Sequence, residues 1–420
     1  MKAKILVAMA AATLVVSACS SATSSSSGSS SASQTAQAAH KVTVGRFTFP
    51  SGQATGSVIK IGLVNSNNQI PQVVKAAQAA VNYVNAKLDG IAGHKIELSV
   101  CDEMSSAAAA SACTPQFVQD KVAAVIGYPL VWLSIGGLKG LAAANIPYLG
   151  VGQGDAQSAA NSYPMFGGTI QELNFGTQYK ALSIKTLNVL DVNFPANIQS
   201  INGIDKSVWS SFGVTVGKTV FYTSGAADVT TPAQQATAGD PDGIYMGNGP
   251  QDVARTAAAI RQAGYKGVLF QSYSALTPQL FPAAASVLKD NVTETGQLLY
   301  FDDPTNPEVA LMHTILGSIP ADSFAQVGVA QVLTLADMGN HIGPDLTGQA
   351  FLNYLKNVHG QKVYMGYQMD ISQVPLNEPQ LSHITNPFSR FMIYNGKTWV
   401  YKSGWVSVFG TAKPGVGAGS

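Results

Sequence analysis

The sequence predicts an α/β protein with two lobes, in which each lobe is a mostly parallel β-sheet flanked by helices. Short apolar runs rich in β-branched residues alternate with segments of helical period, as buried parallel strands and their covering helices do. This alternation starts a second time near Leu187. The length of 420 residues, 46% of them hydrophobic, is sufficient for two cores.

The first residues predict an export signal. Lys2 and Lys4 precede an apolar stretch of twelve residues (5–16), which is too short to span a bilayer. The Val-Ser-Ala-Cys segment that follows resembles the lipobox of bacterial lipoproteins, which implies cleavage before Cys19 and acylation of that residue. The alternative is an ordinary secretory signal with a cysteine nearby. We therefore expect a signal peptide over residues 1–18.

A serine-rich segment follows Cys19. Ten of the fourteen residues from 20 to 33 are Ser, and none is large and apolar. Such a segment cannot bury enough surface to offset the entropy of ordering it. We interpret residues 19–55 as a lipidated tether, with the folded body beginning near Gly56.

The first lobe is predicted from a strand at residues 58–64 (VIKIGLV). Apolar residues at helical spacing between Ile70 and Val84 then predict an amphipathic helix. The following pattern alternates in the same way, with strands expected at 95–101, 122–126 and 146–151, an Ala-rich helix after the first of these and a helix at 133–143. This order is typical of a parallel sheet with right-handed crossovers.

The second lobe repeats the pattern. Strands are expected at 187–192, 214–222, 243–246 and 268–270, with a helix at 251–263. From about Pro304 the chain is predicted to be mainly helical. A hairpin then follows over 391–401, with an Asn-Gly turn at 395–396.

Composition and missing motifs exclude several function classes. Lys plus Arg is 24 and Asp plus Glu is 23, without a basic cluster, which excludes nucleic acid as a main partner. No apolar span reaches eighteen residues, which argues against an integral membrane protein. The motifs of serine hydrolases, zinc proteases and nucleotide-binding loops are missing, so we expect no enzyme activity and no cofactor.

Metal binding is not expected either. The six His residues are scattered, and the Asp-Pro-Asp-Gly segment at 240–243 fits a turn better than a calcium loop. Asp302 and Asp303 could end a strand or place an acid beside the cleft, and the sequence leaves this open.

Five segments in the first lobe resemble a known family in their order and spacing, namely 59–62, 81–86, 90–98, 122–127 and 144–147. Together they resemble the Leu/Ile/Val-binding type of periplasmic substrate-binding protein, a type I periplasmic-binding-protein clamshell that serves ABC transporters. The resemblance covers about residues 58–401. It implies lobe 1 over 56–167 and 302–387, lobe 2 over 168–301 and 388–410, and a tail over 411–420. It also implies three crossovers, near 166–169, 298–302 and 386–388.

The implied function is a membrane-anchored extracytoplasmic receptor that encloses a small solute between its lobes. The resemblance further implies a monomer that delivers this solute to the permease and ATPase subunits of an ABC importer. A sensor of the same fold that signals to a partner without transport is the alternative, and an extracellular enzyme is a third class.

The expected ligand site departs from the family pattern. Hydroxyl-bearing residues that hold an amino-acid carboxylate are replaced by Val131 and Trp132, and residues 271–274 lack the acid that would pair with an ammonium group. Backbone N–H groups of the helix expected near Leu133 could still serve an anion. Because a zwitterion in a closed cleft needs partners for both charges, we do not expect a plain branched-chain amino acid.

Aromatic and amide side chains instead predict a larger, neutral or aromatic-bearing ligand. The predicted ligand-binding residues follow strands, where an α/β sheet places its site. They are Tyr128, Val131, Trp132, Gly152, Gln153, Phe194, Tyr245, Asn248, Gln271 and Tyr273. Core packing is the alternative for each aromatic residue taken alone, Tyr245 above all.

Cys101 and Cys113 are predicted to form a disulfide. They are the two thiols that remain once Cys19 is acylated, and an exported protein reaches an oxidising compartment. Cys101 ends a strand and Cys113 lies in the following helix, which can pack back on that strand. A pair of buried free thiols is the alternative.

Overall fold

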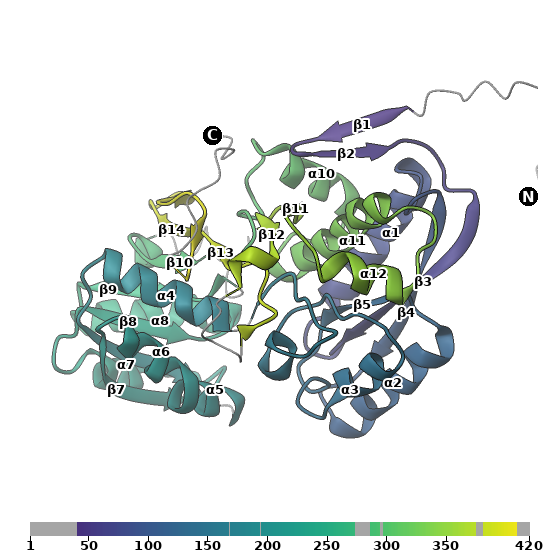
Figure 1. The fold of residues 1–420 in the computed structure, drawn as a ribbon. Coiled ribbons are helices and arrows are strands. Elements are labelled where there is room, and N and C mark those ends of the chain that lie inside the picture. Colours follow the sequence, from purple (N-terminus) through teal and green to yellow (C-terminus); the bar gives the residue numbers. More distant parts are fainter. Residues whose placement is uncertain are drawn as a thin grey trace, which may run out of the picture. The chain divides into compact units, whose positions relative to one another are not determined.

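The computed structural model describes residues 40–167, 169–193, 195–273, 286–294, 297–374 and 381–409. Two β-sheets dominate this part of the chain, one with three strands and one with seven (Figure 1). We call each sheet with its helices a lobe, lobe 1 for the smaller sheet and lobe 2 for the larger. The predicted α/β class with parallel sheets flanked by helices is confirmed.

Lobe 1 contains a parallel sheet in the order β4-β3-β5. Its strands are β3 (Gly56–Asn65), β4 (His94–Asp102) and β5 (Ala124–Tyr128). Its helices are α1 (Pro71–Lys87), α2 (Ala107–Asp120), α3 (Gly137–Ala143), α10 (Pro307–Leu316), α11 (Ser323–Ile342) and α12 (Gly348–Leu355).

The central strand β3 is covered on both faces, because successive side chains point to opposite sides of a strand. Ile61 and Leu63 belong to the same apolar cluster as the buried residues of α1 and α11. A Cβ added at Gly62 would lie 2.9 Å from the Phe117 ring of α2, so α2 packs closely on the other face. The apolar run that predicts this strand therefore reflects double coverage.

Helix α11 is the core helix of lobe 1, although it follows lobe 2 in the chain. It packs along α1 at close range, since a Cβ at Gly328 would lie 2.4 Å from the Val73 carbonyl oxygen. The Gln331 side chain accepts from Gly127 N at 3.0 Å and donates to Gly127 O at 3.1 Å. These two bonds join α11 to the end of β5.

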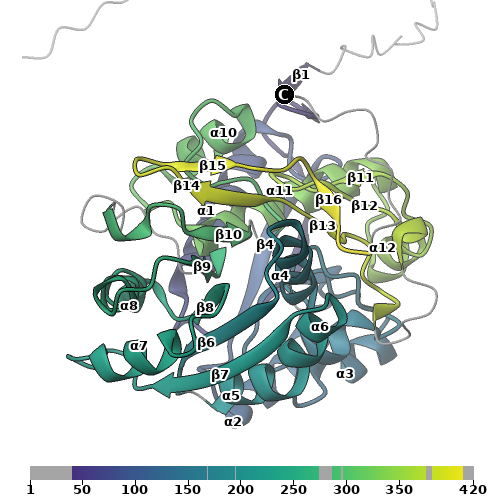
Figure 2. The ribbon, with the colours of Figure 1, turned by 90° about the vertical axis from the view of Figure 1, so that its left-hand side faces the viewer.

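Lobe 2 contains a sheet in the order β15-β14-β10-β9-β8-β6-β7, in which only the pairings of β14 are antiparallel. Its strands are β6 (Thr186–Val192), β7 (Thr215–Tyr222), β8 (Gly243–Gly247), β9 (Val268–Gln271), β10 (Val292–Glu294), β14 (Phe391–Tyr394) and β15 (Trp399–Tyr401). Figure 2 shows the β14–β15 hairpin beside β10. The turn of this hairpin contains the predicted Asn395 and Gly396, and Gly396 has φ +91°.

The helices of lobe 2 are α4 (Thr169–Ala181), α5 (Pro195–Ser200), α6 (Lys206–Ser211), α7 (Thr230–Thr237) and α8 (Pro250–Gln262), with a π-helical turn at Ile201–Asp205 between α5 and α6. Shorter elements are the 3₁₀ turns at Gly154–Gln157 and Ile371–Gln373 and the strands β11 (Gln361–Lys362), β12 (Gln368–Met369), β13 (Phe388–Ser389) and β16 (Val406–Ser407). None of the helices in the described ranges combines the length and the apolar character that a membrane crossing requires.

An N-terminal hairpin corrects the predicted boundary of the folded body. Strands β1 (Lys41–Val44) and β2 (Phe47–Pro50) pair antiparallel, and Phe47 and Phe49 are fully buried in the core of lobe 1. The sequence interpretation assigned residues 19–55 to the tether, whereas folded structure is present from Lys41. Two buried rings in a four-residue strand provide the apolar area that the serine-rich segment lacks.

Arg46, in the turn of this hairpin, holds the hairpin on lobe 1. Its guanidinium donates to the Glu308 carboxylate at 2.9 and 3.2 Å, and Glu308 is 2% exposed. The same guanidinium donates to the carbonyl oxygens of Val363 at 3.1 Å, Tyr367 at 3.2 Å and Gly366. A planar group with five donors can make all these contacts at once.

Two predicted elements of lobe 1 are shorter than expected. The fourth strand, expected at 146–151, forms only isolated bridges. Tyr148 pairs with Val125 of β5 and with Ser162, and Val151 pairs with Phe166 of the following loop. Pro147 lacks an N–H and interrupts the donor side of the ladder. Helix α3 begins at Gly137, because the residues from Trp132 to Gly136 form consecutive turns.

Candidate functional site

A cavity lies between residues of the two lobes. Its walls come from the end of β5, the second residue after β9, the first turns of α4 and α11, and the segments that connect the lobes. The lining residues are Tyr128, Val151, Phe166, Gly167, Ile170, Gln171, Tyr273, Gln297, Leu298, Ser323, Phe324, Val327 and Ser389. Ligands of α/β proteins bind at the carboxyl ends of the strands, which is where this cavity lies.

Aromatic rings form much of the cavity wall. Tyr128 and Phe324 meet edge to face with ring centroids 5.6 Å apart, and both are half-buried. Tyr273 is buried, and its hydroxyl points away to lobe 1, where it lies 2.8 Å from Gln326 Oε1 and accepts from Phe301 N at 2.9 Å. Its ring is therefore held in place by hydrogen bonds outside the cavity. Such walls suit the faces and edges of a flat apolar solute.

Four polar side chains line the same cavity. Gln171 donates to Ser272 Oγ at 2.8 Å, and Ser389 Oγ accepts from Asn174 at 2.7 Å. Ser323 is 4% exposed, and its hydroxyl has no hydrogen-bond partner within the described ranges. A buried hydroxyl that faces a cavity without a partner is suited to a hydrogen bond with a bound solute.

Gln297 is the fourth polar residue, and it joins the segments that connect the lobes. Its side chain accepts from Gly167 N and donates to Asn386 O. Asn386 in turn donates to the Met165 carbonyl oxygen at 2.8 Å. These contacts tie together the three segments that the resemblance identifies as crossovers.

The cavity lining is uncharged among the described residues. The nearest acid along α11 is Asp322, whose side chain caps the helix by accepting from Ala325 N at 2.8 Å. Burial raises the pKa of the Asp322 carboxyl, although hydrogen bonds from the backbone of Ala325 and Phe324 oppose this shift. The described residues also contain no cluster of three or more His, Cys, Asp or Glu that could hold a metal ion.

Of the residues predicted from the sequence, Tyr128 and Tyr273 line this cavity. Phe194 lies outside the described residues, as does Cys19. The other predicted residues are absent from the lining, and Trp132 differs most from expectation. It is fully buried, its Nε1 donates to Thr114 Oγ1 at 3.0 Å, and its ring packs on Tyr148 with centroids 5.6 Å apart. Its side chain points into the core of lobe 1 between α2 and α3.

The remaining predicted residues have partners elsewhere. Tyr245 packs on Phe175 and Trp209 in the core of lobe 2, in agreement with the core-packing alternative. Asn248 donates to Thr256 Oγ1 at 2.7 Å, and Gln271 is fully buried.

Two of the predicted residues lie in the loop that follows the irregular fourth strand. Gly152 N donates to Phe166 O at 2.7 Å, and Gln153 is exposed ahead of a 3₁₀ turn. In the loop after β5, Val131 N donates to the Glu103 carboxylate.

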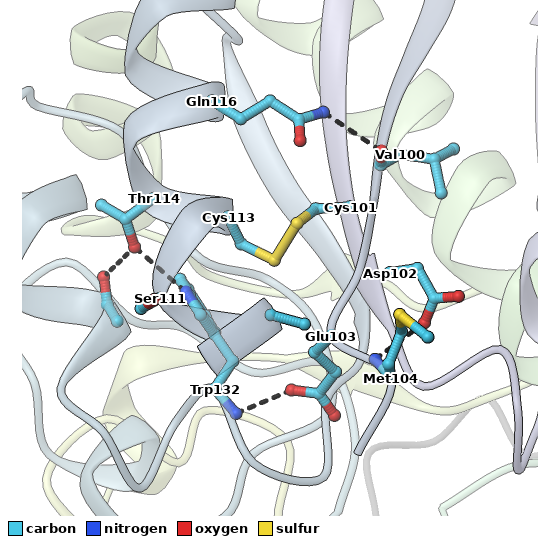
Figure 3. Close-up of a disulfide and its surroundings, with 12 residues drawn as sticks. Val100, Cys101, Asp102, Glu103, Met104, Ser111, Cys113, Thr114, Gln116 and Trp132 are labelled. Atoms are coloured by element: carbon cyan, nitrogen blue, oxygen red, sulfur yellow. Dashed lines mark hydrogen bonds between the residues drawn. A yellow bond between two sulfur atoms is a disulfide. The ribbon is translucent and has the colours of Figure 1, made fainter. Parts of the chain in front are cut away.

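The predicted disulfide between Cys101 and Cys113 is confirmed, with Cα atoms 5.4 Å apart. It links the end of β4 to α2 and lies in the same apolar cluster as Trp132 (Figure 3).

Comparison with known proteins agrees with the fold. The family model described as periplasmic binding protein matches residues 62–373. This chain belongs to that family. The predicted family and the type I fold class are thereby confirmed, and the family implies an extracytoplasmic location.

Solved periplasmic binding proteins have the same fold at low sequence identity. A substrate-binding periplasmic protein from Ralstonia solanacearum is 14% identical, with a TM-score of 0.65 over 82% of this chain and 100% of its own. A leucine-binding protein from Thermotoga maritima is 16% identical, with a TM-score of 0.63 over 83% and 99%. The solute-binding protein of an ABC transporter from R. palustris, solved with benzoate, is 15% identical, with a TM-score of 0.64 over 82% and 96%. Comparison with curated protein sequences found no match.

Proposed function

We propose that this periplasmic binding protein is a lipid-anchored receptor that encloses a small solute and delivers it to an ABC importer. The observation that carries the proposal is the cavity, whose lining comes from both lobes and from the segments that join them. Such a lining lets a bound solute favour one arrangement of the two lobes, which a transporter can recognise. The family and its structural neighbours are solute-binding proteins rather than enzymes.

The chemistry of the cavity supports a neutral solute with an aromatic or apolar body, rather than a branched-chain amino acid. Rings of Tyr128, Tyr273 and Phe324 provide contact area, and Gln171 and Ser323 provide hydrogen bonds at fixed places. No charged side chain among the described lining residues could pair with an ammonium or a carboxylate group. The R. palustris protein was solved with benzoate, so the fold can accommodate a solute with one benzene ring.

Calorimetry on the purified protein tests the binding function. A panel of neutral aromatic amides and alcohols should contain a solute that binds with micromolar affinity, while leucine, isoleucine and valine bind poorly. Gln171→Ala should weaken binding about tenfold, which corresponds to the loss of one hydrogen bond. Gln78→Ala is the matched control, because Gln78 is an exposed helical glutamine outside the cavity. Micromolar binding of leucine would contradict the proposed ligand class.

The membrane anchor is tested separately. Cys19→Ala should move the protein from the detergent phase to the aqueous phase when cells are extracted with a phase-separating detergent, because the acylated thiol is lost. A variant that partitions like the parent would refute the anchor. Uptake of the bound solute by cells that lack this protein, but retain the permease and ATPase, tests delivery.

A further inference from the structure

Glu103 occupies a ring of hydrogen-bond donors at the edge of lobe 1. It follows β4, and its carboxylate accepts from three successive backbone N–H groups in the loop after β5. The contacts are to Trp132 N at 2.7 Å, Val131 N at 3.1 and 3.2 Å, and Leu130 N. The Ser66 hydroxyl, which follows β3, donates at 2.5 Å. Successive N–H groups that converge in a turn form a binding site for an anion.

This site is filled from within the chain. Glu103 and Ser66 are fully buried, and all the groups around the carboxylate are donors, so the side chain accepts throughout, as an ionised carboxylate does. The ion pairs found within the described ranges do not involve Glu103. Its burial is therefore offset by hydrogen bonds from neutral donors alone. Figure 3 shows the bond from Trp132 N to this carboxylate, close to the disulfide.

Glu103 and its donors do not line the cavity, but the loop that binds the carboxylate begins beside a residue that does. Ser66, Glu103 and Leu130 follow the three strands of lobe 1, so the carboxylate lies at the carboxyl edge of the sheet. Tyr128, two residues before Leu130, lines the cavity. A solute carboxylate that approaches this edge meets a buried negative charge and backbone donors that are already bonded. The sequence predicted anion-binding N–H groups in a helix beginning near Leu133. That helix begins at Gly137, and the groups bonded to Glu103 belong to the loop before it.

We propose that Glu103 is a specificity-determining residue, whose carboxylate fills the anion site of lobe 1 so that the cavity accepts neutral solutes and rejects carboxylates. This inference rests on the proposed function for its biological meaning. The occupied anion site can nevertheless be tested without any solute.

Sodium acetate is the probe, and Glu103→Ala is the variant, because truncation empties the donor ring and leaves its backbone groups in place. Acetate at 100 mM should raise the unfolding midpoint of this variant by about 2 °C relative to equal sodium chloride, in a saturable manner. The parent should show no such difference. If the variant is unfolded in chloride, acetate should restore its far-UV circular dichroism. A variant that responds equally to acetate and chloride, whether folded or unfolded, would overturn the proposal.

Glu103→Gln is the matched control, since its amide fills the space without carrying a charge. Acetate should leave its midpoint unchanged, and an acetate response equal to that of Glu103→Ala would show a non-specific salt effect and overturn the proposal. For specificity, benzoate and benzamide are compared by calorimetry, since they differ in the carboxylate alone. Glu103→Ala should bind benzoate at least tenfold more tightly than the parent does, and an unchanged benzoate affinity would overturn the inference.

The two proposals fail in different ways. If the parent binds no solute in the panel, the proposed function fails, while the acetate response still reports on Glu103. If acetate has no specific effect, the inference on Glu103 fails, while binding of a neutral solute by the parent leaves the receptor function intact.

Discussion

Reducing the Cys101–Cys113 disulfide should destabilise lobe 1 by an amount that the structure allows us to calculate. The bond closes a short loop, with a sequence separation of 12. The loop-entropy relation gives about 3 kcal/mol at 25 °C for a loop of this length. With an m value of about 3 kcal/mol/M, the urea midpoint should fall by about 1 M.

The measurement compares oxidised and reduced protein in a Cys19→Ala background, so that the remaining thiols are the two in question. Both forms keep both sulfur atoms, and the comparison therefore isolates the cross-link from the loss of buried volume. Urea unfolding followed by circular dichroism gives the two midpoints. The Cys101→Ala/Cys113→Ala double variant is the control, and reductant should not change its midpoint. An unchanged midpoint on reduction of the parent would refute this account.

Three further predictions concern single side chains. Tyr128→Ala should weaken solute binding at least tenfold with little loss of stability, whereas Trp132→Ala should lower the free energy of unfolding by about 3–5 kcal/mol, as calorimetry and urea unfolding can distinguish. Arg46→Ala should cost about 2–3 kcal/mol because it leaves the buried Glu308 carboxylate without its cation, and Arg46→Lys should restore only part of this. Burial lowers the pKa of His383 from 6.5, so the unfolded chain takes up a proton first, and stability should fall as the pH drops below 6.5. His383→Asn should lessen this loss between pH 7 and 5, and parallel stability curves for parent and variant would contradict it.

The order of strands and helices could be predicted because burial on both faces leaves a direct mark on the sequence. The run around Ile61 and Leu63 is apolar at nearly every position, since α1, α11 and α2 cover both faces. The hairpin at Lys41–Pro50 leaves almost no such mark. It is stabilised by two rings, by Arg46 and by a glutamate 262 residues away, and no local pattern reveals such a distant partner.

Only the cavity residues at the ends of strands could be predicted from the sequence. Tyr128 is the last residue of β5 and Tyr273 lies two residues after β9, so their position at the sheet edge follows from the pattern alone. Trp132 lies four residues after Tyr128, in a turn whose direction is set by the contacts with Glu103 and Thr114. Ser323 and Gln297 come from a helix start and a connecting segment, whose approach to the cavity depends on the whole chain.

The discontinuous construction of lobe 1 has a consequence for the growing chain. Helix α1 stays uncovered until α11 has been synthesised. The hydrogen bonds between Gln331 and Gly127 join residues separated by a stretch of 204 positions. At 5–20 residues per second, synthesis of that stretch takes about 10–40 seconds. Throughout this interval the first three strands lack the helix that covers one of their faces. Lobe 2 in turn waits for its hairpin β14–β15, so neither lobe is complete until most of the chain has been made. An exported protein gains from this order, because a chain that has not finished folding can still be translocated in extended form.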